Sequence, residues 1–510
     1  MTQTDAWRVL STDPDFKPDL FRVTWMGRLA RWTGIGSAEQ VILARAQFAL
    51  FVMSFDAMDE EPTLRIRPLA ALVIETHTTE RRMRPAIERW VKRLAQRVYP
   101  QSRTERRMLD GIEFVEWVST KDGRRIVVAF IGSVAIIGND ARAVQACTLV
   151  RRGAKPSLAG NKNLELLRTR VSGDRAVAFG YVSALGLGKI AAFAAQLYFE
   201  RVSASAEAQQ IFSKAAEGIL EGAAWATTTE GVSVEDRYFV SLSPDLANPL
   251  RDAFAGSSGT SFAANALLPG DTYSFTQYNL QDPRLAWRGL NRAISSHVDI
   301  LGAVLLNPLL RAVLWPYGID DPDTFLGAIG PEIVTVRLDG AATTSVLIVQ
   351  PLDTPTLQRL LSKRLGPGAR TERVAPYELR SSIEGTFSAG FVEGRLIMGP
   401  PELVRRCLMA KLQRTTLDLA KSARQVSALS ASEPPLAVTY TREAESVKGF
   451  LSLVSTNSRY AESNTKLLSD IPYSVSTTNL SGNGFEKTTH STFGLLATLV
   501  AQVASELTAE

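Results

Sequence analysis

The sequence is short of the residues on which many functional sites depend. Its 510 residues include only two cysteines, Cys147 and Cys407, and three histidines, His77, His297 and His490. Two cysteines exclude a disulfide framework and a cysteine-rich zinc site, and we interpret both as small core residues. The histidines lie far apart in the sequence, so no local histidine motif for metal binding or catalysis is present.

Long apolar segments and the common catalytic motifs are also missing. The most apolar stretch, residues 300–315, is interrupted by polar residues and is too short to cross a bilayer. The nearest approach to a P-loop, residues 183–190, lacks the first glycine and the final hydroxyl. No Gly-x-Ser-x-Gly or His-Glu-x-x-His sequence occurs. We therefore predict no catalytic, cofactor-binding or metal-binding residues.

Charge is moderate and mixed. The chain is 45% hydrophobic and 21% charged, with a formal net charge of +5, which permits an acidic partner without requiring one. Acidic clusters occur at residues 56–61 and 320–323. Oxygen-rich loops can bind calcium or magnesium, but neither cluster has the required alternating spacing. We interpret both as solvated loops.

An internal repeat is present. Residues 126–147 and 387–407 each read as a strand, a glycine-containing turn, a short apolar strand that ends in glycine, and the start of a helix; Gly138 matches Gly399. Further segments match in the same order: 47–56 with 332–339, 71–94 with 345–365, 175–182 with 435–441, and 223–240 with 472–493. Ordered matches of this kind predict two copies of one unit laid end to end.

The repeat leads to a fold class and to domain boundaries. Short connections between strands favour antiparallel pairing. We predict an α+β fold, a tandem duplication of an antiparallel-sheet unit with helices packed on one face. The first repeat is expected in residues 1–255, a small polar linker in 256–265, and the second repeat in 266–510.

We expect the first copy to lack one strand of the second. The second copy opens with an alternating strand at residues 266–280, and its counterpart would fall before Met1. Two explanations stay open. The first copy has lost its opening strand, or the true chain begins further upstream.

Several motifs together resemble a known family. They are ALVIETHTTE (71–80), AIIGNDARAVQA (135–146), GVSVEDRYFVSLSP (231–244) and LLPGDTYSF (267–275). They are similar to an uncharacterised family of bacterial proteins, common in acidobacteria, defined only as a domain of unknown function. Its members usually carry an export signal or membrane anchor before tandem units. The resemblance implies a periplasmic or cell-envelope location and no activity; because no export signal is visible here, a cytoplasmic location stays open.

The strongest charge feature is residues 81–107, with ten Lys or Arg against two Glu. Ile87, Trp90 and Leu94 form an apolar stripe at helical spacing, so we expect them to face the sheet and the basic residues to cover the outer face. The other interpretation of this Arg-rich helix is a surface for an acidic partner, with candidate residues Arg81, Arg82, Arg84, Arg89, Arg93 and Arg97.

Taken together, these features predict a non-catalytic binding or scaffold protein of the bacterial cell envelope. Its expected partner is another protein or an envelope component; no cofactor and no nucleic acid are expected. Two alternatives remain. One is a hydrolase-like enzyme with a site between the two repeats. The other is a binder of an acidic partner through the Arg-rich helix.

Overall fold

The structure is a computed structural model. It describes residues 34–60, 63–171, 176–191, 218–230, 233–254, 263–295, 314, 317–340, 345–417, 434–444, 447, 471, 473–495 and 498. Two compact units are defined. The larger unit comprises Met1–Phe16, Leu166–Lys448 and Glu462–Thr498, and the smaller unit comprises Lys17–Glu165, Gly449–Ala461 and Leu499–Glu510. Most of the expected linker, 256–262, lies outside the described residues.

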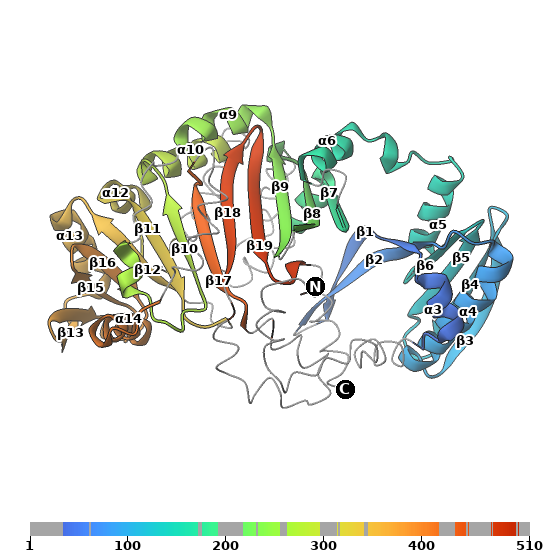
Figure 1. Cartoon of the computed structure of the whole chain (residues 1–510), viewed down its shortest axis with the longest axis horizontal. Coiled ribbons are helices and arrows are strands. Elements are labelled where there is room, and N and C mark those ends of the chain that lie inside the picture. Colours follow the sequence, from blue (N-terminus) through green and yellow to red (C-terminus); the bar gives the residue numbers. More distant parts are fainter. Residues whose placement is uncertain are drawn as a thin grey trace. The chain divides into compact units, whose positions relative to one another are not determined.

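The smaller unit is built on an antiparallel sheet of six described strands in the order β1-β2-β6-β5-β4-β3 (Figure 1). The strands are β1 (Gln47–Glu60), β2 (Thr63–Glu75), β3 (Ser102–Leu109), β4 (Ile112–Ser119), β5 (Arg125–Ile131) and β6 (Val134–Gly138). Its helices are α3 (Ser37–Leu43), α4 (Glu80–Val98) and α5 (Ala141–Arg151), with a 3-10 turn, η1, at Leu158–Gly160.

Helices cover both faces of this sheet, so the prediction that they pack on one face is wrong. On one face, Ile87 and Trp90 of α4 share a core with Val128. On the other, Val144 of α5 packs with Val127. Neighbouring residues of a strand point to opposite faces, and the inner strands are apolar at consecutive positions because both faces are buried.

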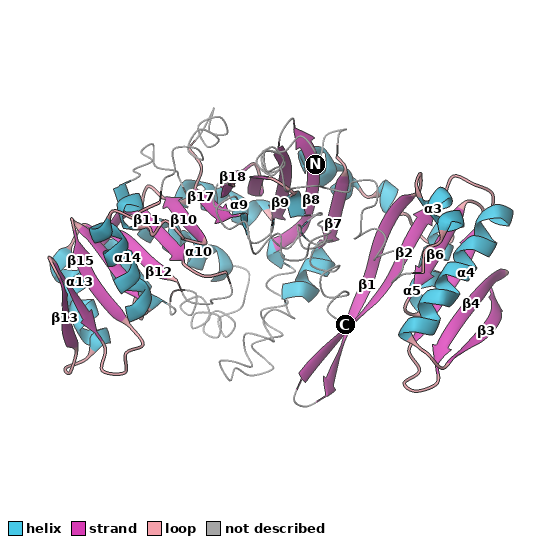
Figure 2. Ribbon diagram, turned by 60° about the horizontal axis from the view of Figure 1, so that its bottom comes forward, coloured by secondary structure: helices cyan, strands magenta, loops and turns pink. Residues whose placement is uncertain are grey.

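The larger unit contains a sheet of 13 described strands in the order β13-β14-β15-β16-β12-β11-β10-β17-β18-β19-β9-β8-β7, and every pairing is antiparallel (Figures 1 and 2). The strands are β7 (Ala178–Ser183), β8 (Leu220–Glu230), β9 (Ser233–Leu242), β10 (Ser274–Asn279), β11 (Ile329–Arg337), β12 (Val346–Pro351), β13 (Arg370–Val374), β14 (Tyr377–Ser381), β15 (Ser388–Val392), β16 (Arg395–Gly399), β17 (Ala437–Arg442), β18 (Tyr473–Ser481) and β19 (Gly484–Ser491).

Helices again lie on both faces of the larger sheet. They are α6 (Lys162–Val171), α9 (Pro244–Ala253), α10 (Pro283–Ser295), α12 (Pro322–Gly327), α13 (Thr354–Leu365) and α14 (Pro401–Gln413), with a 3-10 turn, η3, at Ala263–Leu267. Val404 of α14 packs with Ile348 of β12 on one face. Leu357 of α13 packs with Val349, the next residue of β12, on the other. The α+β class is therefore correct, with a sheet between two helical layers.

Two-residue turns close the hairpins that the sequence predicts. Glu393 and Gly394, between β15 and β16, both have positive φ angles, 47° and 76°. Such a turn matches the right-handed twist of the strands it joins. Between β5 and β6, Gly132 has a φ of 63° and Ser133 completes the loop. Register in both hairpins is thus fixed locally.

The two sheets share an order of strands. From one edge the smaller sheet runs β3-β4-β5-β6-β2-β1, and the larger begins β13-β14-β15-β16-β12-β11. Gly138 ends β6 and Gly399 ends β16. A Cβ atom on Gly138 would lie 3.0 Å from the carbonyl oxygen of Ala70, and one on Gly399 would lie 3.0 Å from that of Ser345. Because glycine has no Cβ, each of these residues allows a backbone carbonyl group of the neighbouring segment, that of Ala70 or that of Ser345, to approach closely.

Candidate functional site

The Arg-rich segment is a helix only in part, which corrects the prediction of one helix over 81–107. Helix α4 ends at Val98, and β3 begins at Ser102. Pro100 explains the break, because a proline disfavours helical geometry in the residue before it. Ile87 and Trp90 are buried against the sheet as predicted, whereas Leu94 is half-buried.

The six candidate arginines divide into two groups. Arg84 donates to Glu80 and Glu113, at 2.8 and 2.5 Å. Arg93 donates to Glu39 and to the carbonyl oxygen of Gly34. Arg97 is exposed and also takes part in an interaction. That leaves Arg81, Arg82 and Arg89 as exposed cations without an ion pair within the described residues.

Arg93 is a structural residue of the smaller unit. Its Nη2 atom lies 2.8 Å from Glu39 Oε1, and Glu39 Oε2 accepts a 2.8 Å hydrogen bond from the Gly36 N–H. The Glu39 side chain is 3% exposed. Burial raises its pKa, but the hydrogen bonds from Arg93 and from backbone N–H groups outweigh burial and hold the pKa below its ordinary value. Arg93 therefore fastens α3 to α4.

A pocket of about 320 Å³ lies in the larger unit between α10 and the sheet. Its lining comes from the ends of α9 and β10, from α10, from residues before α12, and from α12, β11 and β12. The lining residues are Phe254, Tyr278, Leu280, Pro283, Ala286, Trp287, Leu290, Leu314, Tyr317, Ile319, Phe325, Leu326, Ile329, Ile333, Thr335, Leu347 and Val349. Almost all of these side chains are aliphatic or aromatic. A volume of this size falls within the range of small-molecule sites, roughly 300–1,000 Å³.

The described lining has few polar side-chain groups, namely the indole N–H of Trp287 and three hydroxyl groups. The hydroxyl groups belong to Tyr278, Tyr317 and Thr335. Burial raises the pKa of Tyr278, and a hydrogen bond with the Thr335 side chain opposes part of that effect. The phenol is therefore uncharged at neutral pH and can donate a hydrogen bond. No charged side chain lines the described wall, so the pocket favours a neutral, largely apolar occupant.

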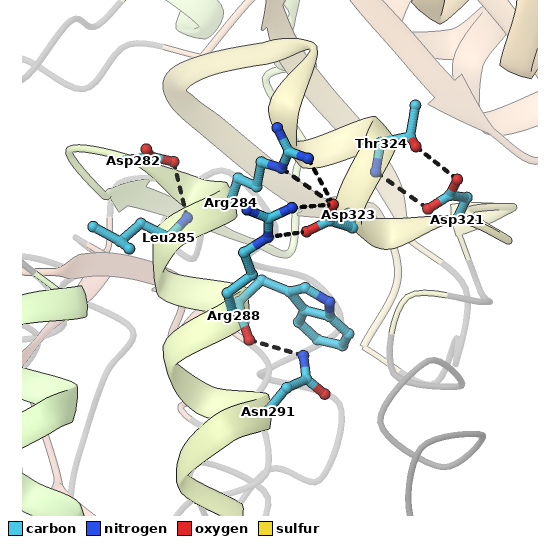
Figure 3. A network of polar contacts seen from close by, with 9 residues as sticks. Asp282, Arg284, Leu285, Arg288, Asn291, Asp321, Asp323 and Thr324 are labelled. Atoms are coloured by element: carbon cyan, nitrogen blue, oxygen red, sulfur yellow. Dashed lines mark hydrogen bonds and ion pairs between the residues drawn. The ribbon is translucent and has the colours of Figure 1, made fainter. Parts of the chain in front are cut away.

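An ion-pair cluster fixes the helix that covers the pocket (Figure 3). Arg284 and Arg288, one turn apart on α10, both donate to Asp323 of α12, at distances from 2.6 to 3.2 Å. The guanidinium groups of Arg288 and Arg284 hold the pKa of Asp323 well below its ordinary value. The cluster links α10 to α12, which both contribute wall residues.

The acidic segment 320–323 is thus more than a solvated loop, which corrects the interpretation from sequence. Asp321 caps α12 by accepting from the Thr324 N–H and hydroxyl, at 3.2 and 2.7 Å. Asp323 is the partner of both arginines. The signal available in sequence was Asp-Pro-Asp-Thr, a helix start that places one acid at the cap and the other in the first turn.

A second depression, of about 620 Å³, is polar. It is lined by Asp271, Tyr273, Leu338, Asp339, Gly340, Arg406 and Arg442. Arg406 forms an ion pair with Asp271. The lining also holds Asp339 and Arg442, so its two negative and two positive charges cancel. This balance favours neither an anion nor a cation.

The remaining ionisable groups, within the described residues, form no cluster of metal ligands. Among the described residues no group of three or more His, Cys, Asp and Glu side chains could hold a metal ion. His490 lies 3.3 Å from Glu235, and His297 lies outside the described residues. Cys147 is half-buried and Cys407 is buried, and both are free. Burial raises the pKa of Cys407 to about 12, which keeps the thiol protonated and unreactive.

Glu443 is a buried carboxyl that follows β17. Its two oxygens each accept a 3.0 Å hydrogen bond from the Thr492 N–H, and it also bonds the Thr492 hydroxyl. Burial raises its pKa to about 7. Glu443 thus links the end of β17 to the end of β19. Ionising its carboxyl group costs free energy, because the charged form is buried.

Comparisons with protein-family models, with curated proteins and with solved structures find no match. The family resemblance drawn from the motifs therefore stays a prediction. Across the part of the chain that the structure describes, no helix combines the length and the apolar character needed to cross a membrane.

We predict that Arg93→Ala lowers the free energy of unfolding by about 1–3 kcal/mol, because it leaves the buried Glu39 carboxylate without its charged donor. Arg89→Ala is the matched control on the same helix, and its exposed side chain should change stability by less than about 0.5 kcal/mol. Urea denaturation of both variants tests this. Equal losses would contradict the structural role of Arg93.

Glu443 predicts a pH dependence of stability. Its pKa is about 7 in the folded protein against 4.5 ordinarily, so between these values the native state keeps a proton that the unfolded state releases. The contribution is fully present below pH 4.5 and is lost as pH rises through 7, by at most about 1.4 kcal/mol per pH unit.

Glu443→Gln should flatten this decline. The measurement is the difference in unfolding free energy between variant and parent at about pH 5 and pH 8, with exposed Glu378→Gln as the control. A difference that stays constant with pH for Glu443→Gln would contradict the assignment.

Proposed function

We propose that this chain is a non-catalytic binding protein that holds a neutral, largely apolar small molecule in the pocket beneath α10. The observation that carries the proposal is the lining itself. The described lining is mostly apolar, with three hydroxyl groups and the Trp287 indole N–H as its polar side-chain groups. A pocket of this kind binds through burial of apolar surface and orients its ligand through a few hydrogen bonds.

The expected ligand has an aliphatic or aromatic body and one hydrogen-bond acceptor. The acceptor would meet the Tyr278 hydroxyl, which stays protonated at neutral pH. Trp287 and Tyr317 supply aromatic surface, and Leu347 and Val349 of β12 supply aliphatic surface. The Arg284–Arg288–Asp323 cluster supports this role, because it holds α10 in place without placing a charge among the lining residues.

We also propose that the chain is a tandem duplication of one α+β unit. The shared strand order of the two sheets supports it, as does the register. Leu72 lies opposite Ile137, the residue before Gly138; Leu347 lies opposite Met398, the residue before Gly399. In the sequence match Gly138 corresponds to Gly399, so Ile137 corresponds to Met398, and their strand partners Leu72 and Leu347 both fall within the matched segments 71–94 and 345–365.

The pairing of β9 with β19 supports the duplication independently. The hairpins β8–β9 and β18–β19 correspond through their turns, where Glu230 faces Ser233 and Ser481 faces Gly484. On that correspondence Arg237 matches Thr488, and these two residues face each other in the β9–β19 ladder. A residue that faces its own counterpart is the signature of a two-fold, self-complementary contact. The two copies thus meet as subunits of a symmetric dimer would.

The pocket predicts the effect of filling it. Ala286, on α10, lines the pocket and is 2% exposed, whereas its neighbour Leu285 is 50% exposed. Ala286→Phe should weaken binding of the neutral fluorescent probe N-phenyl-1-naphthylamine at least tenfold, and Leu285→Phe should leave it unchanged. Thermal melting checks that both variants fold, since overpacking costs about 1–3 kcal/mol. Equal probe binding by folded Ala286→Phe, or none by the parent protein, would overturn the proposal.

The duplication predicts matched effects of two substitutions. Gly138→Ala and Gly399→Ala should each destabilise by about 1–3 kcal/mol, because each new Cβ would crowd a backbone carbonyl oxygen, that of Ala70 or that of Ser345. Gly160→Ala is the control, since nothing lies within 4 Å of a Cβ there. If alanine at Gly138 or at Gly399 has as little effect on stability as alanine at Gly160, the proposal that the two glycines occupy equivalent positions is wrong.

A further inference from the structure

β1 is a long strand with one side unpaired in the described structure. It runs for 14 residues and pairs only with β2, so it forms one edge of the smaller sheet. Its side chains are unusually apolar for an edge. Phe48, Leu50 and Phe55 are 55%, 72% and 45% exposed, and Val52 and Met53 are exposed as well.

An edge of this kind is normally avoided. Unpaired N–H and C=O groups in a flat, apolar strand are a template for another strand, and proteins usually shorten such edges or place Lys, Pro or a bulge on them. The segment Phe48–Phe55 contains no Lys, Arg or Pro. By contrast, the opposite edge of the same sheet, β3, carries three arginines: Arg103, Arg106 and Arg107. Within the described residues, β3 carries protective charges, whereas the segment Phe48–Phe55 of β1 has only a bulge or irregularity between Val52 and Ser54, beyond the stretch Phe48–Val52.

The larger unit shows the equivalent strand with both sides paired. In the smaller sheet Phe48 of β1 lies opposite Ile74 of β2, and in the larger sheet Ile333 of β11 lies opposite Val349 of β12. On the proposed duplication β2 corresponds to β12, so β11 is the counterpart of β1. β11 pairs with β12 on one side and with β10 on the other. Its residues Ile333, Val334 and Val336 are 9%, 2% and 0% exposed.

β10 shows what such an added strand looks like. Phe275 lies opposite Val336, and Gln277 lies opposite Val334. Phe275, Gln277 and Asn279 are buried, while Ser274, Thr276 and Tyr278 are half-buried. β10 is therefore a short, uncharged strand that places a phenylalanine and an amide on the same face.

We propose that the free side of β1 accepts an extended, uncharged segment of another polypeptide, which adds to the sheet as an antiparallel strand in the manner of β10 on β11. By the same register, its large apolar residue lies opposite Phe51 and its amide residue opposite Ala49. Backbone hydrogen bonds supply affinity, and the side chains of β1 supply selectivity for an apolar strand over a charged one. The proposal rests on the duplication and is independent of the pocket.

The test uses the full chain and a fluorescein-labelled peptide with the sequence of residues 267–280, LLPGDTYSFTQYNL. Fluorescence anisotropy measures binding. A second peptide carries proline at the positions of Thr276 and Gln277, which removes an N–H from each side of the strand. The expected result is saturable binding of the first peptide and at least tenfold weaker binding of the second.

Protein variants locate the site. Leu50→Lys puts a charge on the free edge at an exposed position, and Met108→Lys is the matched control at an exposed position on β3, the opposite edge. Leu50→Lys should weaken peptide binding at least tenfold, and Met108→Lys should not change it. In the parent protein, the peptide should also slow amide hydrogen exchange within residues 48–55.

The outcomes separate the possibilities. Absence of peptide binding, or equal loss in both lysine variants, overturns the proposal. So does a concentration-dependent dimer of the chain that Leu50→Lys abolishes and the peptide does not displace, because the occupant is then a second copy. Binding of N-phenyl-1-naphthylamine, measured on the same variants, should stay unchanged, so failure of the pocket is seen separately from failure of the edge.

Discussion

The constraint on which this structure depends is that a buried strand needs a hydrogen-bonded neighbour on each side. Inner strands such as β11 meet it and are almost fully buried. β9 and β19 would otherwise be the edge strands of two separate sheets, and the ladder between them gives each strand its second neighbour. This ladder joins segments some 250 residues apart in the chain. Such a ladder contributes stability only after a long loop has been closed, so its many cross-strand pairs must offset that entropy together. The larger sheet exists as one body because this edge-to-edge contact is complete.

The sequence predicted the local parts of the fold well. Gly394 and Gly132 predicted tight hairpins because few other residues adopt positive φ, and the apolar stripe of Ile87 and Trp90 predicted the buried face of α4. Prediction failed where tertiary context decides. A consecutive apolar run such as Leu72, Val73 and Ile74 is compatible with burial on one face or two, and it does not say how many helical layers cover the sheet. The basic residues continue through 81–107, but Pro100 disfavours helical geometry at Tyr99, so charge alone does not mark the end of the helix.

The candidate sites show a different limit of sequence reasoning. The sequence groups Arg84 and Arg93 with the solvent-facing arginines of α4, yet Glu39, the acidic partner of Arg93, and Glu113, the second partner of Arg84 besides Glu80, lie on other elements. A cation that is paired across the fold cannot be told from a free one by its own neighbours in sequence. The same holds for Asp323 and for the pocket, whose wall residues come from segments separated by long stretches of chain. Only the alternation of β10 and β11 could have hinted at which side chains share a face.

Strand β10 accounts for the difference between the pocket and the β1 edge. Ile333 and Thr335 of β11 line the pocket, together with Tyr278 of β10. On the proposed duplication their counterparts in β1 are Phe48 and Leu50, which are exposed. Where β10 is present, it pairs with β11, supplies the tyrosine, and precedes the helix that covers the pocket. Where no described strand takes its place, the same face and the same backbone edge remain open. A single strand therefore separates the two proposed modes of binding, a closed site for a small molecule in one copy and an acceptor for an extended chain in the other.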